Sequence, residues 1–437
     1  MSHVVSPREA ATPIRVALLG AGTVGSQTAR LLVEQAQDLS ARIGRPMQLV
    51  GVSVLDPDEV TVPWIDKSLL TTNSEELVTR ADIVIELIGG IEPARTLLLK
   101  ALNSGASVVT ANKALLATHG PELYKAAAEN GVDIYFEAAV GGAIPIVRPL
   151  RESLVGDRVN RVMGIVNGTT NYILDEMTLK GITFDEALKD AQAKGFAEAD
   201  PTADIEGFDA AAKAAIIACL SFHTDVRMDD VRTEGISHVT ASDIAAAKAL
   251  NRVIKLLAVV TRTEKGITAG VYPAMIPLNH PLAAVHGSFN AVFVEAEAAG
   301  DLMFYGQGAG GAPTASAVVG DVVSEARHLS HGSLGPDIPL YANLPILEGD
   351  EDESSFVMRV LVLDAPGVLA KVSQTFANHG ISIKAVTQLQ LKDKDGYNEL
   401  WITTHVVSEK SVHETAKDLD NLVPIQSVLS IMRIFED

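Results

Sequence analysis

Apolar residues in the first third of the chain form short runs that alternate with amphipathic stretches. The run 14–20 (IRVALLG) is almost continuously apolar and ends in glycine, which is typical of a strand buried on both faces of a parallel sheet. Similar runs occupy 48–55, 81–88, 106–110 and 132–137, and helical patterns occupy 93–103 and 121–130. This alternation predicts a doubly wound α/β domain.

Beyond residue 140 the patterns become those of a mixed α+β domain. Helical patterns cover 144–155, 169–180, 185–194 and 204–222, and one strand-like run lies at 158–166. Strand patterns follow at 252–261, 267–275 and 291–298, the first two on either side of the turn-like sequence TEKG. We expect a sheet with helices on one face, and we expect the helical stretch 312–329 to return to the first domain.

The end of the chain predicts a small domain of its own. The acidic segment 348–355 (EGDEDESS) has too little apolar surface to pack, so we interpret it as a linker. Strand patterns follow at 356–363, 381–390, 399–407 and 425–433, with helical patterns at 367–379 and 411–422. The order βαββαβ is that of a ferredoxin-like unit.

Composition and charge narrow the classes of function. With 47% hydrophobic and 21% charged residues, the chain of 437 residues is expected to form about three folded domains. Its net charge of −20 argues against nucleic acid and anionic membranes as partners. The single cysteine, Cys219, excludes an internal disulfide and a cysteine-rich zinc site. We find neither a secretory leader nor an apolar run of about 20 residues, and we expect a cytoplasmic protein.

A glycine motif directly follows the first predicted strand and opens a helix. Its spacing is GxGxxG, in which the first glycine permits a tight turn and the second lets the backbone approach a pyrophosphate. The third allows the helix to pack closely on the strand. The motif predicts a dinucleotide site that includes Gly20, Ala21, Gly22, Thr23, Val24 and Gly25.

Asp56 follows the second predicted strand, where this class of domain places the residue that contacts the ribose. A carboxylate accepts a hydrogen bond from a free 2′-hydroxyl, whereas a 2′-phosphate requires a cation, so Asp56 favours NAD. The alternative is that Asp56 only forms the turn before Pro57.

The segment 191–213 concentrates carboxylates and ends in a lysine. Its charged residues include Glu198, Asp200, Asp204, Glu206, Asp209 and Lys213. A solvated charged surface is the default explanation. The residues after Lys213 are almost wholly apolar, however, which indicates a buried helix with Asp209 and Lys213 on one face. Burial lowers the pKa of a lysine and a neighbouring carboxylate raises it, so such a lysine can be tuned for proton transfer.

A second lysine, Lys113, lies just beyond the strand predicted at 106–110. This is the carboxyl end of the sheet, where α/β domains bind their ligands. Lys113 is therefore either a functional residue or an exposed loop lysine.

The chain resembles the homoserine dehydrogenase family over nearly its whole length. The segment 191–213 (AQAKGFAEADPTADIEGFDAAAK) looks like the family signature without a departure. The segments NK at 112–113, EAAVGGAIP at 137–145, NGTTN at 167–171 and GQGAGG at 306–311 are also similar to the family. The C-terminal unit, with DAPGVL at 364–369, resembles an ACT regulatory domain.

The resemblance implies the order and the functions of the domains along the chain. After a flexible leader (1–13), an NAD(P)-binding domain of Rossmann type would occupy 14–140 and be completed by about 312–345. A catalytic and dimerisation domain would occupy 141–311, the linker 348–355, and the ACT domain 356–437. A homodimer or homotetramer is expected, with an amino-acid effector, threonine being the one suspected.

The implied reaction is reversible, NAD(P)-dependent interconversion of L-homoserine and L-aspartate 4-semialdehyde, a step toward threonine, methionine and isoleucine. By family analogy Lys213 exchanges the proton, Asp209 orients it, and Lys113 assists near the nicotinamide and the substrate. Glu198 and Asp204 would bind the substrate with Asp209 and Lys113. The expected cofactor contacts also include Gly89, Ala111, Lys113 and Gly310.

The family also implies a monovalent cation, usually sodium, held mainly by backbone oxygens. The candidate ligands are Glu137, Val140, Gly142 and Ile144. Family members that prefer NADP often carry a basic residue just after the second strand, where this chain has Leu55 and Asp56. The choice between NAD and NADP therefore stays open.

Other hypotheses fit the residues less well. A phosphorylating aldehyde dehydrogenase needs a thiolate, but Cys219 lies within an apolar helical pattern and is expected to be an inert core thiol. A non-enzymatic sensor of amino acids and nucleotides would bind both ligands without turnover. The histidines show no metal-binding spacing, and His328 and His331 are expected at the surface.

Overall fold

The computed structural model describes residues 12–347, 353–390 and 396–435. These residues form two compact units. The first unit takes the described residues up to Val159 together with Ala212–Asp229 and Asn290–Asn343. The second unit takes Asn160–Ala211, Asp230–Phe289 and the described residues from Leu344 onward.

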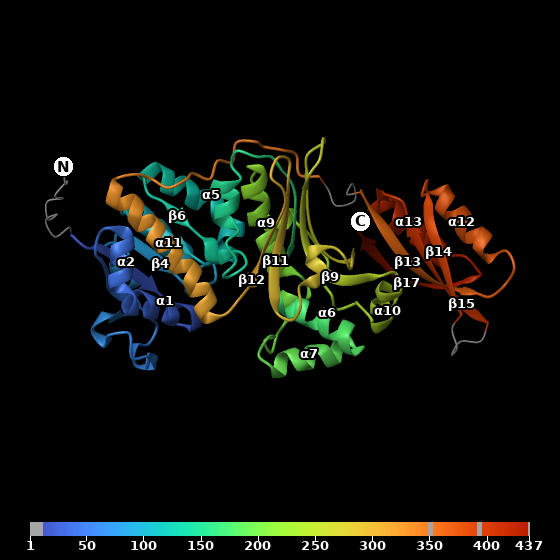
Figure 1. Cartoon of the computed structure of the whole chain (residues 1–437), viewed down its shortest axis with the longest axis horizontal. Helices are drawn as coiled ribbons and strands as arrows, with labels where there is room; N and C mark the ends of the chain where they lie inside the picture. The colour runs from blue at the N-terminus through green and yellow to red at the C-terminus, as the bar shows by residue number, and fades with distance from the viewer. Residues whose placement is uncertain (1–11, 348–352, 391–395, 436–437) are drawn as a thin grey trace, which may run out of the picture. The chain divides into compact units, whose positions relative to one another are not determined.

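A parallel sheet of six strands forms the centre of the first unit (Figure 1). The strands are β1 (Ile14–Leu19), β2 (Met47–Ser53), β3 (Leu70–Thr71), β4 (Ile83–Glu86), β5 (Ser107–Thr110) and β6 (Ile134–Tyr135). Their order is β3-β2-β1-β4-β5-β6, so the direction of winding reverses between β1 and β4. The predicted Rossmann-type fold is confirmed, and this reversal is where such sheets bind ligands.

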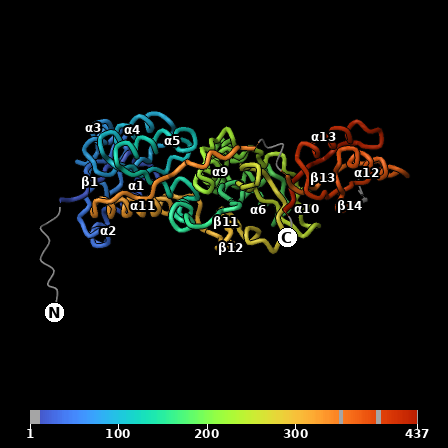
Figure 2. The backbone as a smooth tube through the Cα atoms, turned by 90° about the horizontal axis from the view of Figure 1, so that it is seen from above, coloured from blue at the N-terminus to red at the C-terminus, as the bar shows by residue number. Residues whose placement is uncertain are grey.

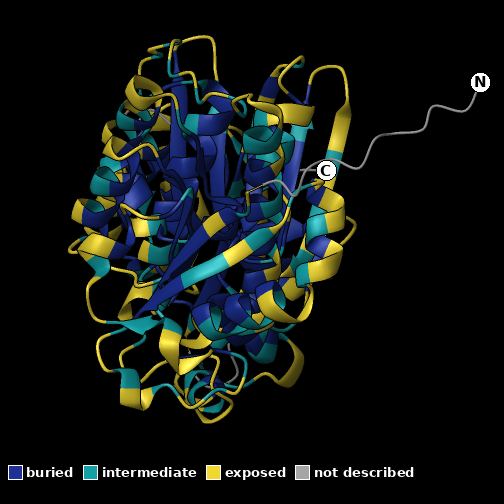
Figure 3. Cartoon of the chain, turned by 90° about the vertical axis from the view of Figure 1, so that its left-hand side faces the viewer, coloured by how far each residue is buried: buried dark blue, intermediate teal, exposed yellow. Residues whose placement is uncertain are grey.

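Helices cover both faces of this sheet and bury the strands between them. They are α1 (Thr23–Glu34), α2 (Ala36–Ile43), α3 (Ser74–Leu77), α4 (Ala94–Asn103), α5 (Lys113–Asn130) and α11 (Gly311–His331). The strands β1, β4 and β5 are almost wholly buried, whereas the first half of β2 is only partly so. In Figure 3 the strands at the centre are dark blue, whereas the helices expose residues on their outer turns. The near-continuous apolar runs of the sequence are explained by this burial on both faces.

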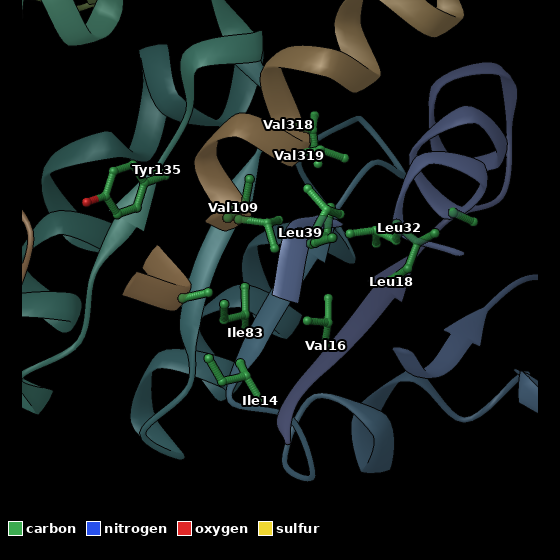
Figure 4. Close-up of a cluster of buried hydrophobic side chains, with 14 of the residues drawn as sticks. Ile14, Val16, Leu18, Leu32, Leu39, Ile83, Val109, Tyr135, Val318 and Val319 are labelled. Atoms are coloured by element: carbon green, nitrogen blue, oxygen red, sulfur yellow. The ribbon is translucent and has the colours of Figure 1, made fainter. Parts of the chain in front are cut away.

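Helix α11 returns to the first unit from late in the chain, as the sequence predicts. It lies beside α1 in both Figure 1 and Figure 2. Its Val318 and Val319 pack in one core cluster with Leu18 of β1, Leu32 of α1 and Leu39 of α2 (Figure 4). A segment almost 300 residues from β1 is therefore part of the nucleotide-binding core.

Two helical expectations in the first unit are wrong in extent. Helix α5 begins at Lys113 instead of 121, because Asn112 caps it and Pro121 is accommodated inside the helix. The helix expected at 144–155 is reduced to a short helix, Pro149–Ser153. The Glu137 side chain accepts hydrogen bonds from the backbone of residues 146–148, and this holds the preceding segment as a loop.

The second unit is built on a mixed sheet whose strand order is β7-β9-β10-β17-β13-β15-β14. The first three strands are β7 (Val159–Ile165), β9 (Arg252–Arg262) and β10 (Ile267–Pro277), with the short β8 (Arg232–Thr233) beside β10. Helices of this part are α6 (Gly168–Lys180), α7 (Phe184–Ala193), α8 (Thr202–Ile205) and α10 (Ala241–Ala249). The two antiparallel strands β9 and β10 pair along their full length, as the sequence predicts.

The expectation of one continuous helix at 204–222 is wrong, because the helix is interrupted at Gly207. That glycine has a φ of +84°, in the left-handed region, and α9 (Phe208–Phe222) begins immediately after it. A Cβ at position 207 would lie 3.1 Å from Thr233 Cγ2. Both backbone conformation and packing therefore favour glycine at this position.

The C-terminal residues form the βαββαβ unit that the sequence predicts. Its elements are β13 (Glu353–Leu363), α12 (Val368–Asn378), β14 (Ile383–Gln390), β15 (Tyr397–Thr404), α13 (Glu409–Asp420) and β17 (Ile425–Ile434), with the short β16 (Val407–Ser408). Of the expected linker, residues 348–352 lie outside the described residues and 353–355 belong to β13. Strand β17 pairs with β10 in parallel through Ala274–Arg433 and Met275–Ile434, so one sheet runs through the whole second unit.

The hairpin of β11 (Phe289–Ala296) and β12 (Gly300–Gln307) leads into α11. Strand β12 was not predicted, since its flanking glycines resemble turn sequence. Among the described helices, none is both long enough and apolar enough to cross a membrane.

Candidate active site

The glycine motif forms a tight turn between β1 and α1 in the first unit. Gly20 has a φ of +94°, and a Cβ on it would lie 2.8 Å from the Leu87 carbonyl oxygen. A Cβ on Gly25 would lie 2.1 Å from the Gly20 carbonyl oxygen, whereas Gly22 meets nothing within 4 Å. Gly20 and Gly25 thus serve the turn and the helix packing, and Gly22 leaves open space beside the N-terminus of α1. This is the shape that a pyrophosphate requires.

A second helix N-terminus lies next to this turn. Helix α11 begins after Gly310, which has a φ of +120°, and no side chain caps either α1 or α11. A Cβ on Gly311 would lie 3.0 Å from the Thr23 carbonyl oxygen. Gly310 is therefore close to the residues of the glycine motif. This position agrees with its expected role as a cofactor contact.

Asp56 lies three residues beyond the end of β2 and is exposed. Its Oδ1 accepts a hydrogen bond from the backbone N–H of Asp58 at 2.9 Å, which caps the short helix Pro57–Glu59. The turn-forming role that sequence left open is therefore present. A hydrogen bond to a ribose would be an additional role of the same carboxylate.

Glu86 organises the loops that follow β4 and β5, a role that sequence reasoning missed. It is fully buried, and its Oε1 accepts hydrogen bonds from the N–H groups of Ile88 and Gly89 at 2.8 and 2.9 Å. Its Oε2 accepts the Thr110 hydroxyl at 2.6 Å. One carboxylate thus fixes Gly89, an expected cofactor contact, and also Thr110, which directly precedes Ala111, another expected contact.

Lys113 is the first residue of α5, at the carboxyl end of β5. Asn112 caps the helix by accepting the Leu115 N–H at 3.1 Å, and its Nδ2 donates to the Gly90 carbonyl oxygen at 2.6 Å. The loops after β4 and β5 are thereby tied together. Lys113 is half-buried there, not an exposed loop lysine.

In the second unit, Asn167 brings two of the predicted carboxylates together. It precedes α6, and its Nδ2 donates to Asp204 Oδ1 at 2.7 Å and to Asp209 Oδ2 at 2.9 Å. The Thr169 hydroxyl donates to the other Asp204 oxygen at 3.0 Å. Asp204 and Asp209 are half-buried, whereas Glu198 is exposed and contributes a backbone carbonyl to Gln192.

Helix α9 carries both Asp209, in its first turn, and Lys213, one turn later. Lys213 is 8% exposed, and the rest of the helix after it is almost entirely buried. The prediction that this helix is buried is therefore confirmed, but Lys213, expected at its solvent-exposed end, is itself buried. Its helical spacing from Asp209 places the two side chains on one face.

The candidate cation loop at residues 137–144 is anchored by Glu137. The buried carboxylate accepts the N–H groups of Ile146, Val147 and Arg148 at 2.6 to 2.9 Å. The Glu137 N–H donates to Asp321 Oδ2 at 2.8 Å, and the Arg148 guanidinium donates to Asp321 Oδ1 at 2.5 Å. Burial raises the pKa of Asp321 to about 6 and also raises the pKa of Glu137.

Two glycines with positive φ values shape the backbone of the cation loop. Gly141 and Gly142 have φ values of +73° and +58°, and a Cβ on Gly142 would lie 2.5 Å from the Gly308 carbonyl oxygen. The Glu137 side chain is occupied by backbone donors. The loop can therefore offer a cation backbone carbonyl oxygens, the type of ligand that the sequence comparison implies for Glu137, Val140, Gly142 and Ile144.

Comparisons with known proteins agree with these features. The homoserine dehydrogenase family model matches residues 145–323, the model of the homoserine dehydrogenase NAD binding domain matches 20–137, and the ACT domain model matches 356–424. The chain is 51% identical over 432 residues to the homoserine dehydrogenase of Mycobacterium tuberculosis, a match that covers 97% of this chain and 98% of that protein. The chain belongs to the homoserine dehydrogenase family.

Other family members match with similar coverage. The homoserine dehydrogenase of Corynebacterium glutamicum is 48% identical, over 97% of this chain and 96% of that protein. The crystal structure of a homoserine dehydrogenase from Thiobacillus denitrificans has a TM-score of 0.91 at 39% identity, over 97% of this chain and 99% of that one. A hyperthermophilic archaeal homoserine dehydrogenase in complex with NADPH has a TM-score of 0.61 at 28% identity, over 72% and 98%.

The family establishes the chain as an NAD(P)-dependent oxidoreductase that carries a C-terminal ACT domain. Sequence reasoning named the glycine motif, both lysines and the carboxylates as candidates. It missed Glu86 and assigned no role to Asn167. The polar end of an otherwise apolar strand (IVIE) was a signal for Glu86, and an asparagine at a strand-to-helix junction was one for Asn167.

Proposed function

We propose that the chain interconverts L-homoserine and L-aspartate 4-semialdehyde with a nicotinamide dinucleotide. The observation that carries the proposal is the hydrogen bonding of one amide, that of Asn167, to both Asp204 and Asp209. Asp209 lies one helical turn before Lys213 on α9. Such a set of fixed carboxylates and a lysine suits a substrate that has both an ammonium group and a carbonyl or hydroxyl group. The glycine turn after β1 supplies the dinucleotide site.

Each residue then has a defined task in the reduction direction. A nicotinamide bound at the glycine turn would supply the hydride, with its electron pair, to the aldehyde carbon, which would leave the carbonyl oxygen as an alkoxide. The Lys213 ammonium stabilises this charge and gives the oxygen a proton, while Asp209 keeps the lysine oriented. Lys113 assists beside the nicotinamide and substrate, and Asp204 and Glu198 bind the substrate ammonium or hydroxyl.

The direct test is turnover by the purified full-length chain. Loss of absorbance at 340 nm with L-aspartate 4-semialdehyde and NADH or NADPH, together with formation of L-homoserine, supports the proposal. Binding of nucleotide and amino acid without turnover would favour the sensor hypothesis instead. The NADPH complex of the archaeal homoserine dehydrogenase makes both cofactors worth testing.

For cofactor preference, we propose NAD, with Asp56 as the ribose contact. A carboxylate repels a 2′-phosphate. We predict that Asp56→Ser raises kcat/KM for NADPH relative to NADH, as measured in parallel assays with both cofactors. Asp58→Ser, two residues further on, is the control. An unchanged ratio in the Asp56 variant would leave Asp56 with only the turn that its Oδ1 forms.

We also propose that the loop at residues 137–144 holds a sodium ion through backbone oxygens of Glu137, Val140, Gly142 and Ile144. The loop offers hard oxygen donors, and two left-handed glycines allow it to curve. The bound ion would hold this loop in one conformation. The test is to measure KM and thermal stability in sodium and in tetramethylammonium buffers of equal ionic strength. Equal values in both buffers would contradict the proposal.

Finally, we propose that the ACT domain makes the enzyme responsive to threonine, in a pathway that also leads to methionine and isoleucine. The matched ACT segment includes the β13–α12 loop at residues 364–367, which would form one wall of an effector site. Association into a homodimer or homotetramer would create such sites between subunits. An enzyme indifferent to threonine would leave the ACT domain as an assembly module.

A further inference from the structure

A buried polar cluster lies in the first unit at the edge of the sheet opposite the glycine turn. Asp133 immediately precedes β6, whereas the glycine motif follows the end of β1. Parallel strands bring their starts to one edge and their ends to the other. Glu325 and His328 reach the same edge from α11, one turn apart. No step of the proposed reaction uses these residues.

The three side chains converge on one point. His328 Nδ1 lies 3.8 Å from Asp133 Oδ2 and 4.0 Å from Glu325 Oε2. The three donor atoms all lie within 4.8 Å of one another. The Tyr135 hydroxyl is 2.9 Å from His328 Nδ1, and the Gly335 N–H donates to Asp133 Oδ2 at 2.6 Å. The Gly335 N–H fixes the orientation of Asp133. Tyr135 holds the His328 ring in place, and its hydroxyl would have to release Nδ1 when an ion binds to that nitrogen.

Glu325 gives a second and independent reason to expect a ligand. The residue is 1% exposed, and its carboxyl group has the Ser107 and Asp133 side chains as hydrogen-bonding neighbours. Its Oε2 atom is nevertheless buried without a hydrogen-bond partner of good geometry among the described residues. A buried carboxylate oxygen that lacks a partner is costly, because it has lost its water and gained no donor. That oxygen faces the His328 ring and Asp133, so a cation between them would satisfy it.

We propose that Asp133, Glu325 and His328 bind one divalent transition-metal ion of the zinc type. Two oxygen donors and one imidazole form a ligand set that zinc accepts, and the ion lies about 2.0 to 2.2 Å from such atoms. Ligands on one ion are then about 3 to 4 Å apart, which matches the separations from His328 Nδ1. The imidazole distinguishes this site from the proposed sodium loop, whose donors are all oxygens.

The position of the three residues shows how an ion can reach them and what a bound ion would do. The His328 side chain is 30% exposed, so an ion can enter past its ring, while Asp133 and Glu325 are buried beneath it. The ion would join the end of α11, the helix that returns from late in the chain, to the start of β6. It would therefore stabilise the first unit without taking part in the reaction, and this inference does not depend on the proposed function.

Calorimetric titration of the chelator-treated full-length chain with zinc chloride, at constant sodium concentration, tests the site. We expect one zinc ion per chain. Glu325→Gln and His328→Gln should each weaken binding at least about tenfold. His331→Gln, an exposed histidine one turn further along α11, should bind as the wild type does. Saturating zinc should also raise the unfolding temperature of the wild type but not of the two site variants.

Two results would overturn the inference. The first is the absence of zinc binding by the wild type at micromolar concentrations. The second is equal affinity in the wild type and the site variants, which would place the zinc elsewhere. If Glu325→Gln does not fold, His328→Gln decides alone, because its side chain is partly exposed.

Discussion

At the scale of single residues, the site depends on side chains that hold other side chains. Asn167 is the clearest case, since one amide bonds two carboxylates that follow it by 37 and 42 residues. Sequence reasoning located Asp204, Asp209 and Lys213, because charge next to an apolar helix is visible in a linear pattern. It gave Asn167 no role, because a bond between distant segments depends on how the loops fold.

His328 is a second example at this scale. It was expected at the surface, but its side chain is only 30% exposed, because the ring lies against Tyr135 and the Asp133 carboxylate. His331 is exposed, as expected. Two histidines three positions apart on one helix differ in this way because α11 presents one face to the sheet and the other to solvent.

We predict that Lys213→Ala lowers kcat by about two to four orders of magnitude, because it removes the proton donor for the alkoxide. The variant should keep its fold by circular dichroism and its affinity for NADH by fluorescence titration. Lys180→Ala, an exposed lysine at the end of α6, is the control. Near-normal turnover in a folded Lys213 variant would reject the assignment.

We predict that Asn167→Asp lowers kcat/KM by about a hundredfold or more, because it removes the shared donor and adds charge beside Asp204 and Asp209. The aspartate keeps an oxygen that can cap α6, so folding should be preserved. Asn73→Asp makes the same change at the exposed cap of α3 and should have no kinetic effect. Equal steady-state kinetics in both variants would contradict the positioning role.

At the scale of elements, periodicity predicted the long helices and buried strands but missed elements without a strong pattern. Helix α10 (ASDIAAAKA) has little apolar periodicity, and only the capping pair Thr240 and Asp243 could have located it. The break at Gly207 could not be predicted from pattern either, since the residues on both sides suit a helix. Its cause is a close approach to Thr233 on β8, which is a tertiary contact.

Strand β9 contains a fully buried lysine, Lys255, whose Nζ donates to Asn171 Oδ1 at 3.0 Å and to the Val285 carbonyl oxygen at 2.6 Å. Burial lowers the pKa of Lys255 to about 8, against the opposing effect of Asp175. Since the unfolded chain keeps the ordinary lysine pKa, the folded chain releases this proton first as pH rises. Stability conferred by this position is lowest below pH 8 and increases between about pH 8 and 10.5.

We therefore predict that the free energy of unfolding of the wild type rises with pH relative to Lys255→Met. The full difference over this window is about 3 kcal/mol, at about 1.4 kcal/mol per pKa unit. Urea unfolding at pH values from 7 to 9.5 measures the rising part of it. Parallel curves for the two proteins would show that Lys255 keeps an ordinary pKa.

At the scale of the whole chain, sequence predicted a separable C-terminal domain, and the structure shows how it is joined to the rest of the second unit. The ladder of β10 and β17 could not be predicted, because their sequences carry no information on which distant strand each one pairs with. A chain ended before β13 would lose this pairing. Regulation by threonine is therefore better tested with substitutions in the 364–367 loop than by truncation.

A buried charge network crosses the same junction. Arg359 of β13 is 4% exposed and donates to Asp243 Oδ1 of α10 and to Glu399 Oε1 of β15, both at 2.5 Å. Ser430 of β17 also donates to Asp243 Oδ1, at 2.7 Å. The guanidinium therefore links helix α10 to strands β13 and β15 of the ACT domain.

We predict that Arg359→Met lowers the free energy of unfolding by about 3–5 kcal/mol, because it leaves the Asp243 and Glu399 carboxylates buried without their cation. Adding Asp243→Asn to this variant should recover part of the loss, since one unpaired charge is then removed. Lys371→Met, at an exposed position on α12, should change stability by no more than about 0.5 kcal/mol. Urea unfolding of the four proteins measures these differences, and a loss for Arg359→Met no larger than that for Lys371→Met would show that the network contributes nothing at this junction.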